Sequence, residues 1–308
     1  MQRRLALATL AGLASTTLVR SGFSATPING KSQTPWIRKT LKINMIQVKG
    51  SLEDKFSAAK AAGFEGVEVN VPLSGMSVKD IAEAAEATGI LVDGSVGGTH
   101  WQVRHSDPDA AVRKKALDNL ILGLEQTAAL GGDSCLLVVG HGKDGTPQEV
   151  TERTIANIKQ ALPTAERLKV QILIENVWNH FLYDHAGDST QSAQPLADYV
   201  DAFESPWVGL QFDLGNHWKY GDVADWVRVL GKRIKKLDIK GFSRETNRFT
   251  KVTEGDVDWP AIEAALREIG FTGWCAAEVG GGGPERLQEI ATNMESALNC
   301  TKPLQAEV

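Results

Sequence analysis

Hydrophobic and polar positions follow two alternating periods along most of the chain. From Leu41 onward, short runs rich in β-branched and aromatic residues are each followed by a stretch with helical spacing. The eight predicted strands are 41–47, 64–71, 90–96, 133–139, 170–175, 207–213, 234–240 and 271–279. Strands separated by helices pair in parallel through crossovers, so the pattern predicts an α/β fold.

The segments between these strands are typical of amphipathic helices. In 77–89 the apolar residues recur at i, i+3, i+4 and i+7, and in 258–270 Pro260 follows a capping Asp258. Glycines that can adopt positive φ stand between a helix and the next strand, namely Gly63, Gly89, Gly131 and Gly270. The helix-start and helix-end signals are therefore those expected of repeated β/α units.

Eight β/α units in about 260 residues fit a closed barrel. The competing architecture is a doubly wound open sheet, which normally carries a glycine-rich phosphate loop after its first strand. Here the first strand leads into "VKGSLEDK", which has no such loop. We therefore predict a single (β/α)8 TIM barrel that occupies residues 41–300.

The N-terminus has a different character. Arg3 and Arg4 precede an apolar run from Leu5 to Val19, and small residues follow as far as Ala25. This is the order of regions in a secretory signal, and the paired arginines suggest the twin-arginine route. The run is shorter than the roughly 20 residues of a membrane span. We expect residues 1–30 to be a signal peptide with a short linker, and the mature protein to be exported, periplasmic and without a stable membrane span.

Charge and cysteine content exclude several classes of protein. The net charge is −5 and no basic run occurs, which argues against a nucleic-acid partner. The three cysteines are widely spaced, unlike a disulfide framework or a zinc cluster. The sequence leaves a homo-oligomer open.

Carboxylates stand at the ends of four successive predicted strands. In a TIM barrel the carboxyl ends of all strands meet at one mouth. Glu175, Asp213, Asp238 and Glu278 should therefore converge there. Unpaired buried carboxylates repel one another, and a divalent cation relieves that cost. Oxygen ligands favour Mg²⁺ or Mn²⁺ over Zn²⁺.

Each of these acids also has a structural interpretation. Asp213 could cap a turn, and Asp238 could pair with Lys236 or Lys240. Lys240 lies two residues after Asp238, so both should face the mouth. Other candidate substrate contacts near strand ends are Glu68, His100, Trp101, His141, Asn179, Asn216 and His217.

Several short motifs resemble those of the xylose isomerase-like TIM barrels, particularly the sugar isomerase/epimerase group. They are "GFEGVEV", "IENVWN", "FDLGN", "EGDVDW" and "GWCAAEV", spread between about Leu41 and Leu298. The resemblance implies one divalent metal held by Glu175, Asp213, Asp238 and Glu278. It also implies that Glu175 and Glu278 are the catalytic acid and base, and that Arg244 holds substrate oxygens.

The chain departs from the family pattern at two places. The usual strand-seven histidine is Asp238, and the acid that commonly follows the strand-seven lysine is Gly241. The histidine three residues after the strand-six aspartate is Asn216, with His217 beside it. The ligand set is therefore all-carboxylate, or His217 takes part.

The resemblance implies a metal-dependent isomerase or epimerase that acts on a sugar or sugar derivative through an enediolate. The alternative is a 3-keto-glycoside lyase or hydrolase that uses the same enolate and expels a leaving group. A DNA-repair endonuclease of this fold is disfavoured by net acidity and six histidines, too few for a multi-zinc site. A non-catalytic sugar-binding barrel is the remaining interpretation, in which tryptophans such as Trp101 stack on a sugar.

Overall fold

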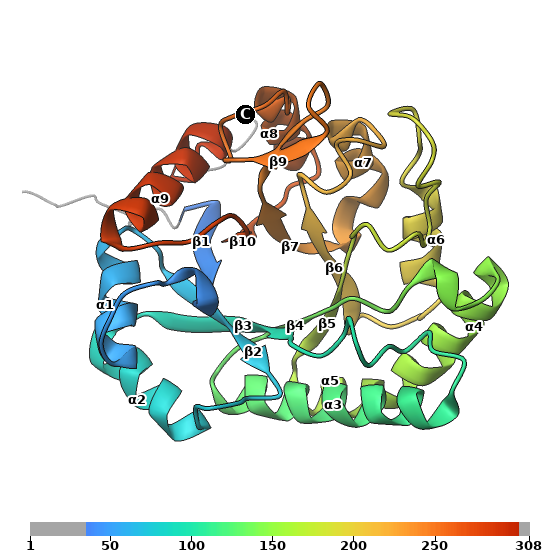
Figure 1. The fold of residues 1–308 in the computed structure, drawn as a ribbon, viewed down its shortest axis with the longest axis horizontal. Coiled ribbons are helices and arrows are strands. Elements are labelled where there is room, and N and C mark those ends of the chain that lie inside the picture. The colour runs from blue at the N-terminus through green and yellow to red at the C-terminus, as the bar shows by residue number, and fades with distance from the viewer. Residues whose placement is uncertain (1–34, 302–308) are drawn as a thin grey trace, which may run out of the picture. The chain divides into compact units, whose positions relative to one another are not determined.

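A closed parallel barrel forms the centre of the computed structural model, which describes residues 35–301 (Figure 1). Within these residues eight strands close in the order β1-β10-β7-β6-β5-β4-β3-β2. Their bounds are β1 Ile37–Lys42, β2 Gly66–Val71, β3 Leu91–Gly97, β4 Ser134–Leu137, β5 Gln171–Glu175, β6 Val208–Asp213, β7 Ile234–Ile239 and β10 Gly273–Ala277. The predicted (β/α)8 barrel is confirmed.

Helices surround the barrel in Figure 1. The α-helices are α1 Leu52–Ala61, α2 Val78–Thr88, α3 Ala110–Ala129, α4 Pro147–Ile158, α5 Leu162–Leu168, α6 Gln194–Asp201, α7 Val223–Leu230, α8 Trp259–Glu268 and α9 Pro284–Leu298. Short 3₁₀ helices occur at η1 Ile43–Met45, η2 Gly142–Asp144, η3 Lys159–Ala161 and η4 Gly231–Arg233. Ser51, Ser77 and Thr146 begin α1, α2 and α4 with capping boxes, which satisfy backbone N–H groups that the helix leaves unpaired.

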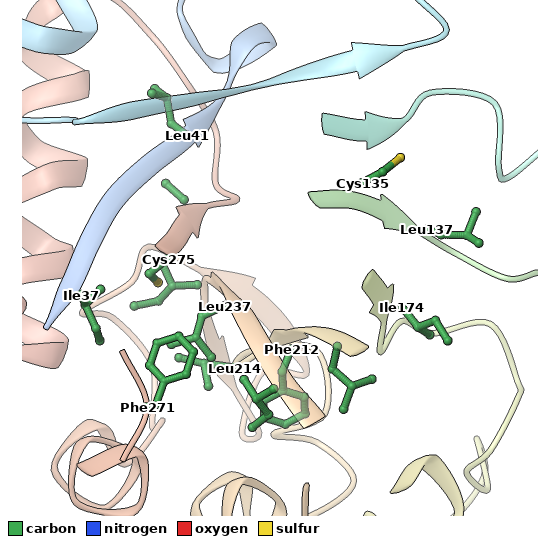
Figure 2. Close-up of a cluster of buried hydrophobic side chains, with 14 of the residues drawn as sticks. Ile37, Leu41, Cys135, Leu137, Ile174, Phe212, Leu214, Leu237, Phe271 and Cys275 are labelled. Atoms are coloured by element: carbon green, nitrogen blue, oxygen red, sulfur yellow. The ribbon is translucent and has the colours of Figure 1, made fainter. Parts of the chain in front are cut away.

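The hydrophobic core lies between the barrel and its helices. Successive strand residues face opposite sides, and buried Leu237 and Ile239 alternate with Lys236 and Asp238 on β7. Figure 2 shows part of this core, with side chains from β1, β6, β7 and β10 among those gathered. The other face of each strand is the barrel interior, and there this protein places charges.

The first strand is one place where the prediction from sequence is wrong. The predicted strand 41–47 is in fact β1 at Ile37–Lys42, followed directly by the 3₁₀ turn η1. The basic residues of β1 interrupt the apolar pattern on which the prediction relied, and each of them has a specific partner in the structure. Arg38 stacks 3.8 Å above the Trp274 ring, and Lys39 lies 3.6 Å from Glu295 of α9.

An antiparallel hairpin follows β7 that the sequence pattern did not indicate. Its strands are β8 Gly241–Ser243 and β9 Arg248–Thr250, with Phe242 opposite Phe249. The predicted signal segment lies outside the described residues and stays a prediction. Among the residues that the structure describes, no helix is long and apolar enough to cross a membrane.

Candidate metal centre and active site

Four carboxylates meet at the carboxyl end of the barrel. Glu175 and Asp213 are the last residues of β5 and β6, Asp238 is the penultimate residue of β7, and Glu278 directly follows β10. One oxygen from each lies within 4.8 Å of those of the others. The convergence expected from the strand ends is therefore present. These strands are neighbours in the barrel, so their inward-facing ends are brought together by closure alone.

Asp213 uses its two oxygens differently. Its Oδ1 accepts hydrogen bonds from the backbone N–H groups of Gly215 (2.8 Å) and Asn216 (2.6 Å). Asn176 holds the backbone of Asp213 from the neighbouring strand end through two further hydrogen bonds. The proposed capping role is thus real, but it occupies one oxygen and leaves Oδ2 facing the cluster.

Lys240 lies between two of the acids. Its Nζ is 3.1 Å from Asp213 Oδ2 and 2.7 Å from Glu278 Oε2. Lys240 directly follows β7 and lies on the same inward side as Asp238, as the period of two predicts. The ammonium offsets part of the carboxylate repulsion at the mouth.

Asp238 has a partner that the sequence did not suggest. Lys42, the last residue of β1, places its Nζ 3.0 Å from Asp238 Oδ2 and 3.2 Å from Oδ1. Gln211 Nε2 donates to Oδ1 at 2.9 Å. Asp238 therefore pairs with Lys42, whereas the lysines considered from the sequence, Lys236 and Lys240, pair with other acids.

The charged network continues into the barrel interior. Glu68 on β2 lies 3.2 Å from Lys42 Nζ and 2.7 Å from Lys236 Nζ, and Lys236 also pairs with Asp93. Lys42 and Glu68 face each other on the neighbouring strands β1 and β2. The pairs of Lys236 on β7 with Glu68 on β2 and Asp93 on β3 join strands that are not neighbours, so they cross the barrel. Glu68 is only 1% exposed and stands in this ion-pair chain, away from the cavity at the mouth.

The electrostatics of the cluster divide its acids into two kinds. Burial, reinforced by Glu278 and Asp238, raises the pKa of Glu175 well above its ordinary value. Burial also raises the pKa of Asp213 to about 8, against the opposing effect of Lys240. Burial opposes ionisation of Glu278 too, but Lys42 and Lys240 outweigh it and lower its pKa to about 2.

Asp238 shows the same competition. Burial, with Glu278 and Glu68, raises its pKa to about 6 although Lys42 acts in the opposite sense. Burial is the main cause of the raised pKa values of Glu175, Asp213 and Asp238, and repulsion between the acids adds to it. The cluster is therefore suited to a cation.

A cavity of ≈ 370 Å³ opens over the acids. Glu175 and Glu278 line it, and so do four of the predicted substrate contacts: His100, Trp101, Asn216 and Lys240. Asn216 Nδ2 approaches Glu175 Oε1 at 3.4 Å. His100 accepts a hydrogen bond at Nδ1 from the Val138 backbone, and burial lowers its pKa to about 4. A neutral imidazole bonded in this way carries its proton on Nε2.

Four other predicted contacts lie outside the cavity lining. His141 accepts from the Lys143 backbone in the loop after β4, and the amide of buried Asn179 donates to the Gly140 carbonyl. His217 is buried against Trp226, and burial lowers its pKa to about 3.

Arg244, the fourth, is held by a neighbouring loop. Its guanidinium stacks 3.8 Å above the Trp218 ring and donates to the carbonyls of Trp218 and Gly221. These contacts fix the segment that follows β8.

Sequence reasoning missed several residues that line the cavity, among them Lys42 and Phe249. The available signal for Lys42 was a basic residue where the first strand ends. Phe249 belongs to the unexpected hairpin, and its ring lies 5.0 Å from Lys240 Nζ and 5.1 Å from the Trp178 ring.

The sequence is similar to those of known proteins. The profile of the family described as xylose isomerase-like TIM barrel matches residues 56–302. The 2-oxo-tetronate isomerase of Pectobacterium atrosepticum is 24% identical over 233 residues, which cover 73% of this chain and 85% of that protein.

Solved structures share the fold over most of the chain. The 3-keto-D-glucoside 4-epimerase from E. coli superposes with a TM-score of 0.70 at 15% identity, covering 86% of this chain and 100% of that one. The D-allulose 3-epimerase from Methylomonas sp., in complex with D-allulose, gives 0.65 at 16% identity, with coverages of 88% and 92%. At these identities the likeness establishes the shared fold.

Proposed function

Because the chain belongs to the xylose isomerase-like TIM barrel family, and so to the sugar isomerase/epimerase superfamily, we propose that it is a sugar isomerase or epimerase that uses one divalent metal ion and an enediolate of its substrate. The observation that carries this proposal is the position of Glu175 and Glu278. Both belong to the acid cluster and both line the cavity above it. A substrate in that cavity would lie against two carboxyl groups from different strands.

The residues present fit a hard divalent cation. Oxygen ligands lie about 2.0–2.6 Å from Mg²⁺ or Ca²⁺, so two ligands of one ion are at most about 5.2 Å apart. The 4.8 Å spread of the cluster meets that limit. Glu175, Asp213, Asp238 and Glu278 would hold the ion, and an all-oxygen set favours Mn²⁺ or Mg²⁺ over Zn²⁺.

In such a site the ion, when bound, supplies a Lewis acid that polarises a substrate carbonyl. The chain's own residues move the protons. One glutamate removes the proton on the carbon next to the carbonyl, and the other returns a proton from the opposite side, which inverts that carbon. Return to the neighbouring carbon isomerises the sugar instead. Each positioned acid–base step contributes roughly 10²- to 10⁴-fold.

Two further side chains in the cavity can bind substrate oxygens. Lys240 presents its ammonium between Asp213 and Glu278, where it can donate to an oxygen that becomes negative in the enediolate. His100, neutral and bonded through Nδ1, can donate its Nε2–H to a hydroxyl.

Proton exchange tests this proposal before any product is known. Keto-sugars and keto-glycosides are incubated with the enzyme and Mn²⁺ in D₂O, and deuterium at carbon is followed by NMR. We expect exchange with wild type, and less than about a tenth of that rate with Glu175→Gln or Glu278→Gln at saturating metal. The amide keeps the shape of the side chain but cannot accept the proton.

The matched control is Glu83→Gln, an exposed acid on α2 that pairs with Lys79. It should exchange at the wild-type rate. Exchange that survives in both cavity variants would contradict the assignment of these glutamates.

Elimination from a 3-keto-glycoside is the second candidate function. It needs the same removal of a proton next to the carbonyl, followed by loss of a leaving group from the β-carbon. The aromatic side chains that line the cavity favour it, because they offer a surface for such a group. Product analysis separates the two reactions: elimination releases an aglycone, whereas epimerisation releases nothing.

A further inference from the structure

Two aromatic side chains are left exposed at the cavity. Among the described residues, five large hydrophobic residues are more than a third exposed: Leu91, Trp101, Leu122, Val229 and Phe249. Trp101 and Phe249, at 45% and 46% exposure, are the aromatic members of this set, and both line the cavity above the acids. Exposed apolar area that rims a cavity is a recurrent mark of a binding surface.

The exposed ring of Phe249 is fixed by the hairpin. Phe249 on β9 stands opposite buried Phe242 on β8, with ring centroids 5.3 Å apart, and it also leans on Trp178 at 5.1 Å. Trp178 is itself anchored by a hydrogen bond from its indole N–H to the Asn216 carbonyl. The ring is therefore placed at the mouth before any ligand arrives.

Trp101 is placed by the loop after β3. The backbone on either side of it is held by hydrogen bonds from Gln102 and Val103 to the Thr99 carbonyl. Its ring meets the buried His100 ring edge-on at 5.8 Å. Trp101 thus comes from a different part of the barrel rim than Phe249.

The positively charged side chains around the cavity already have partners within the protein. The cations among its described lining residues are Lys42 and Lys240, and each contacts two carboxylates. Arg244 is turned to Trp218 and backbone carbonyls. A phosphoryl group would find no uncommitted cation in this lining, and it would face Glu175 and Glu278.

From these observations we propose that Trp101, Trp178 and Phe249 form a subsite for a second ring joined to the reacting sugar by a glycosidic bond. The substrate class is then an unphosphorylated glycoside. This inference rests on the proposed function, since it assumes that the reacting sugar lies at Glu175 and Glu278. The cavity volume of ≈ 370 Å³ falls in the range of about 300–1,000 Å³ that pockets for drug-sized ligands occupy. Aromatic faces stack on planar rings and on the C–H face of sugars.

Direct binding of unreactive ligands tests the subsite without turnover. Calorimetry with the Mn²⁺-loaded enzyme compares methyl β-D-glucoside, phenyl β-D-glucoside, cellobiose and glucose 6-phosphate. We expect phenyl glucoside or cellobiose to bind at least fivefold more tightly than methyl glucoside, and the stronger of the two identifies the second ring as aromatic or sugar. Glucose 6-phosphate should bind most weakly.

Variants of the exposed aromatic residues test whether they cause the tighter binding of two-ring ligands. Trp101→Ala and Phe249→Ala should each abolish most of the fivefold difference in affinity between the two-ring ligand and methyl glucoside, and Trp101→Phe should restore part of it. Leu122→Ala removes an equally exposed hydrophobic side chain on α3, outside the cavity lining, and should change nothing. Thermal melting confirms that each variant is folded.

Two results would overturn the subsite. One is equal or undetectable binding of methyl and two-ring ligands, and the other is tighter binding of glucose 6-phosphate. Because these ligands do not react, the outcome is separate from proton exchange. Proton exchange together with equal binding of methyl and two-ring ligands defeats the subsite alone. Tighter binding of a two-ring ligand without proton exchange defeats the proposed reaction.

Discussion

At the scale of single residues, Lys42 connects the mouth of the barrel to its interior. It lines the cavity, contacts Asp238 and Glu68, and keeps a pKa well above its ordinary value because these acids outweigh the effect of burial. Buried ion pairs add little net stability compared with apolar packing, but the loss of one partner leaves an uncompensated charge. Substitution of Lys42 should therefore lower both the stability of the fold and the rate of the proposed reaction.

Lys42→Met should lower the free energy of unfolding by about 3–5 kcal/mol, the usual cost of breaking a buried pair. Urea unfolding followed by circular dichroism measures it. Lys42→Met/Asp238→Asn, which also removes the carboxylate that loses its lysine partner, should recover part of the loss. A single variant within about 0.5 kcal/mol of wild type would mean that Lys42 is hydrated rather than paired.

Asp238 is the residue at which metal preference should be most sensitive. Its oxygens belong to the cluster, and yet they also accept from Lys42 and Gln211. Asp238→His replaces an oxygen donor by a borderline nitrogen, so the affinity for Co²⁺ should rise relative to that for Mn²⁺ by roughly tenfold. Calorimetric titration of both ions gives the ratio.

Asp238→Asn is the companion variant, since it keeps the size of the side chain and removes its charge. It should weaken Mn²⁺ binding several-fold. If Mn²⁺ and Co²⁺ affinities are unchanged in both variants, Asp238 is only the ion-pair partner of Lys42, and the ion is held by Glu175, Asp213 and Glu278.

The four clustered acids could be predicted because each follows an apolar strand directly, and closure of a parallel barrel brings strand ends together. The Lys42–Asp238 pair could not be predicted in this way. β1 and β7 are separated by β10 in the barrel, so the contact crosses the interior and depends on the lengths of both side chains. The same reason hid the buried position of Glu68.

At the scale of elements, the hairpin after β7 decides the shape of the mouth. It begins at Gly241, where the family pattern commonly has an acid. A Cβ on Gly241 would overlap the carbonyl oxygen of Lys251 and the hydroxyl of Thr250. The close approach of β8 to the chain after β9 therefore requires glycine, and a side chain here would displace the strand that carries Phe249.

Gly241→Ala should destabilise the protein by about 1–3 kcal/mol through overpacking and increase proteolytic cleavage in 241–255. Gly280→Ala is the matched control, because a Cβ there would have no neighbour within 4 Å. Differential scanning calorimetry and limited proteolysis measure both effects. Equal behaviour of the two variants would show that the hairpin tolerates the added methyl group.

Element boundaries were predicted to within one residue for β5, β6 and β7. The predicted strands 170–175 and 207–213 differ from β5 and β6 by one residue at the start. β1 was misplaced because its charged residues obscure the alternation, and the hairpin was missed because Ser243, Arg248 and Thr250 give it no apolar periodicity. In both cases tertiary contacts, rather than local propensity, make the strand.

At the scale of the whole molecule, apolar packing and charge occupy separate layers. Helices cover the hydrophobic face of the strands, and the interior of the barrel carries Lys42, Glu68, Asp93 and Lys236 in buried pairs. The family resemblance read from the strand-end motifs is confirmed by the match over residues 56–302. The four acids at the mouth outnumber the two lysines that contact them, Lys42 and Lys240, and we propose that a divalent cation offsets this excess.

Metal binding should consequently stabilise the folded protein. The unfolded chain does not bring the four acids together, so the ion binds the folded state preferentially. At free Mn²⁺ about 100 times its dissociation constant, the free energy of unfolding should rise by about 2.7 kcal/mol, and EDTA should reverse the rise. Thermal melting with and without Mn²⁺ measures it.

The stabilisation must come from the cluster and not from surface acids. Asp213→Asn, which keeps the turn through its Oδ1 and removes the charge facing Lys240, should lose most of the Mn²⁺-dependent shift. Glu83→Gln, on the exposed face of α2, should keep all of it. A wild-type melting temperature that does not respond to millimolar Mn²⁺ would leave Lys42 and Lys240 as the sole counterions of the acids, and the proposed metal-dependent chemistry would have no place in this barrel.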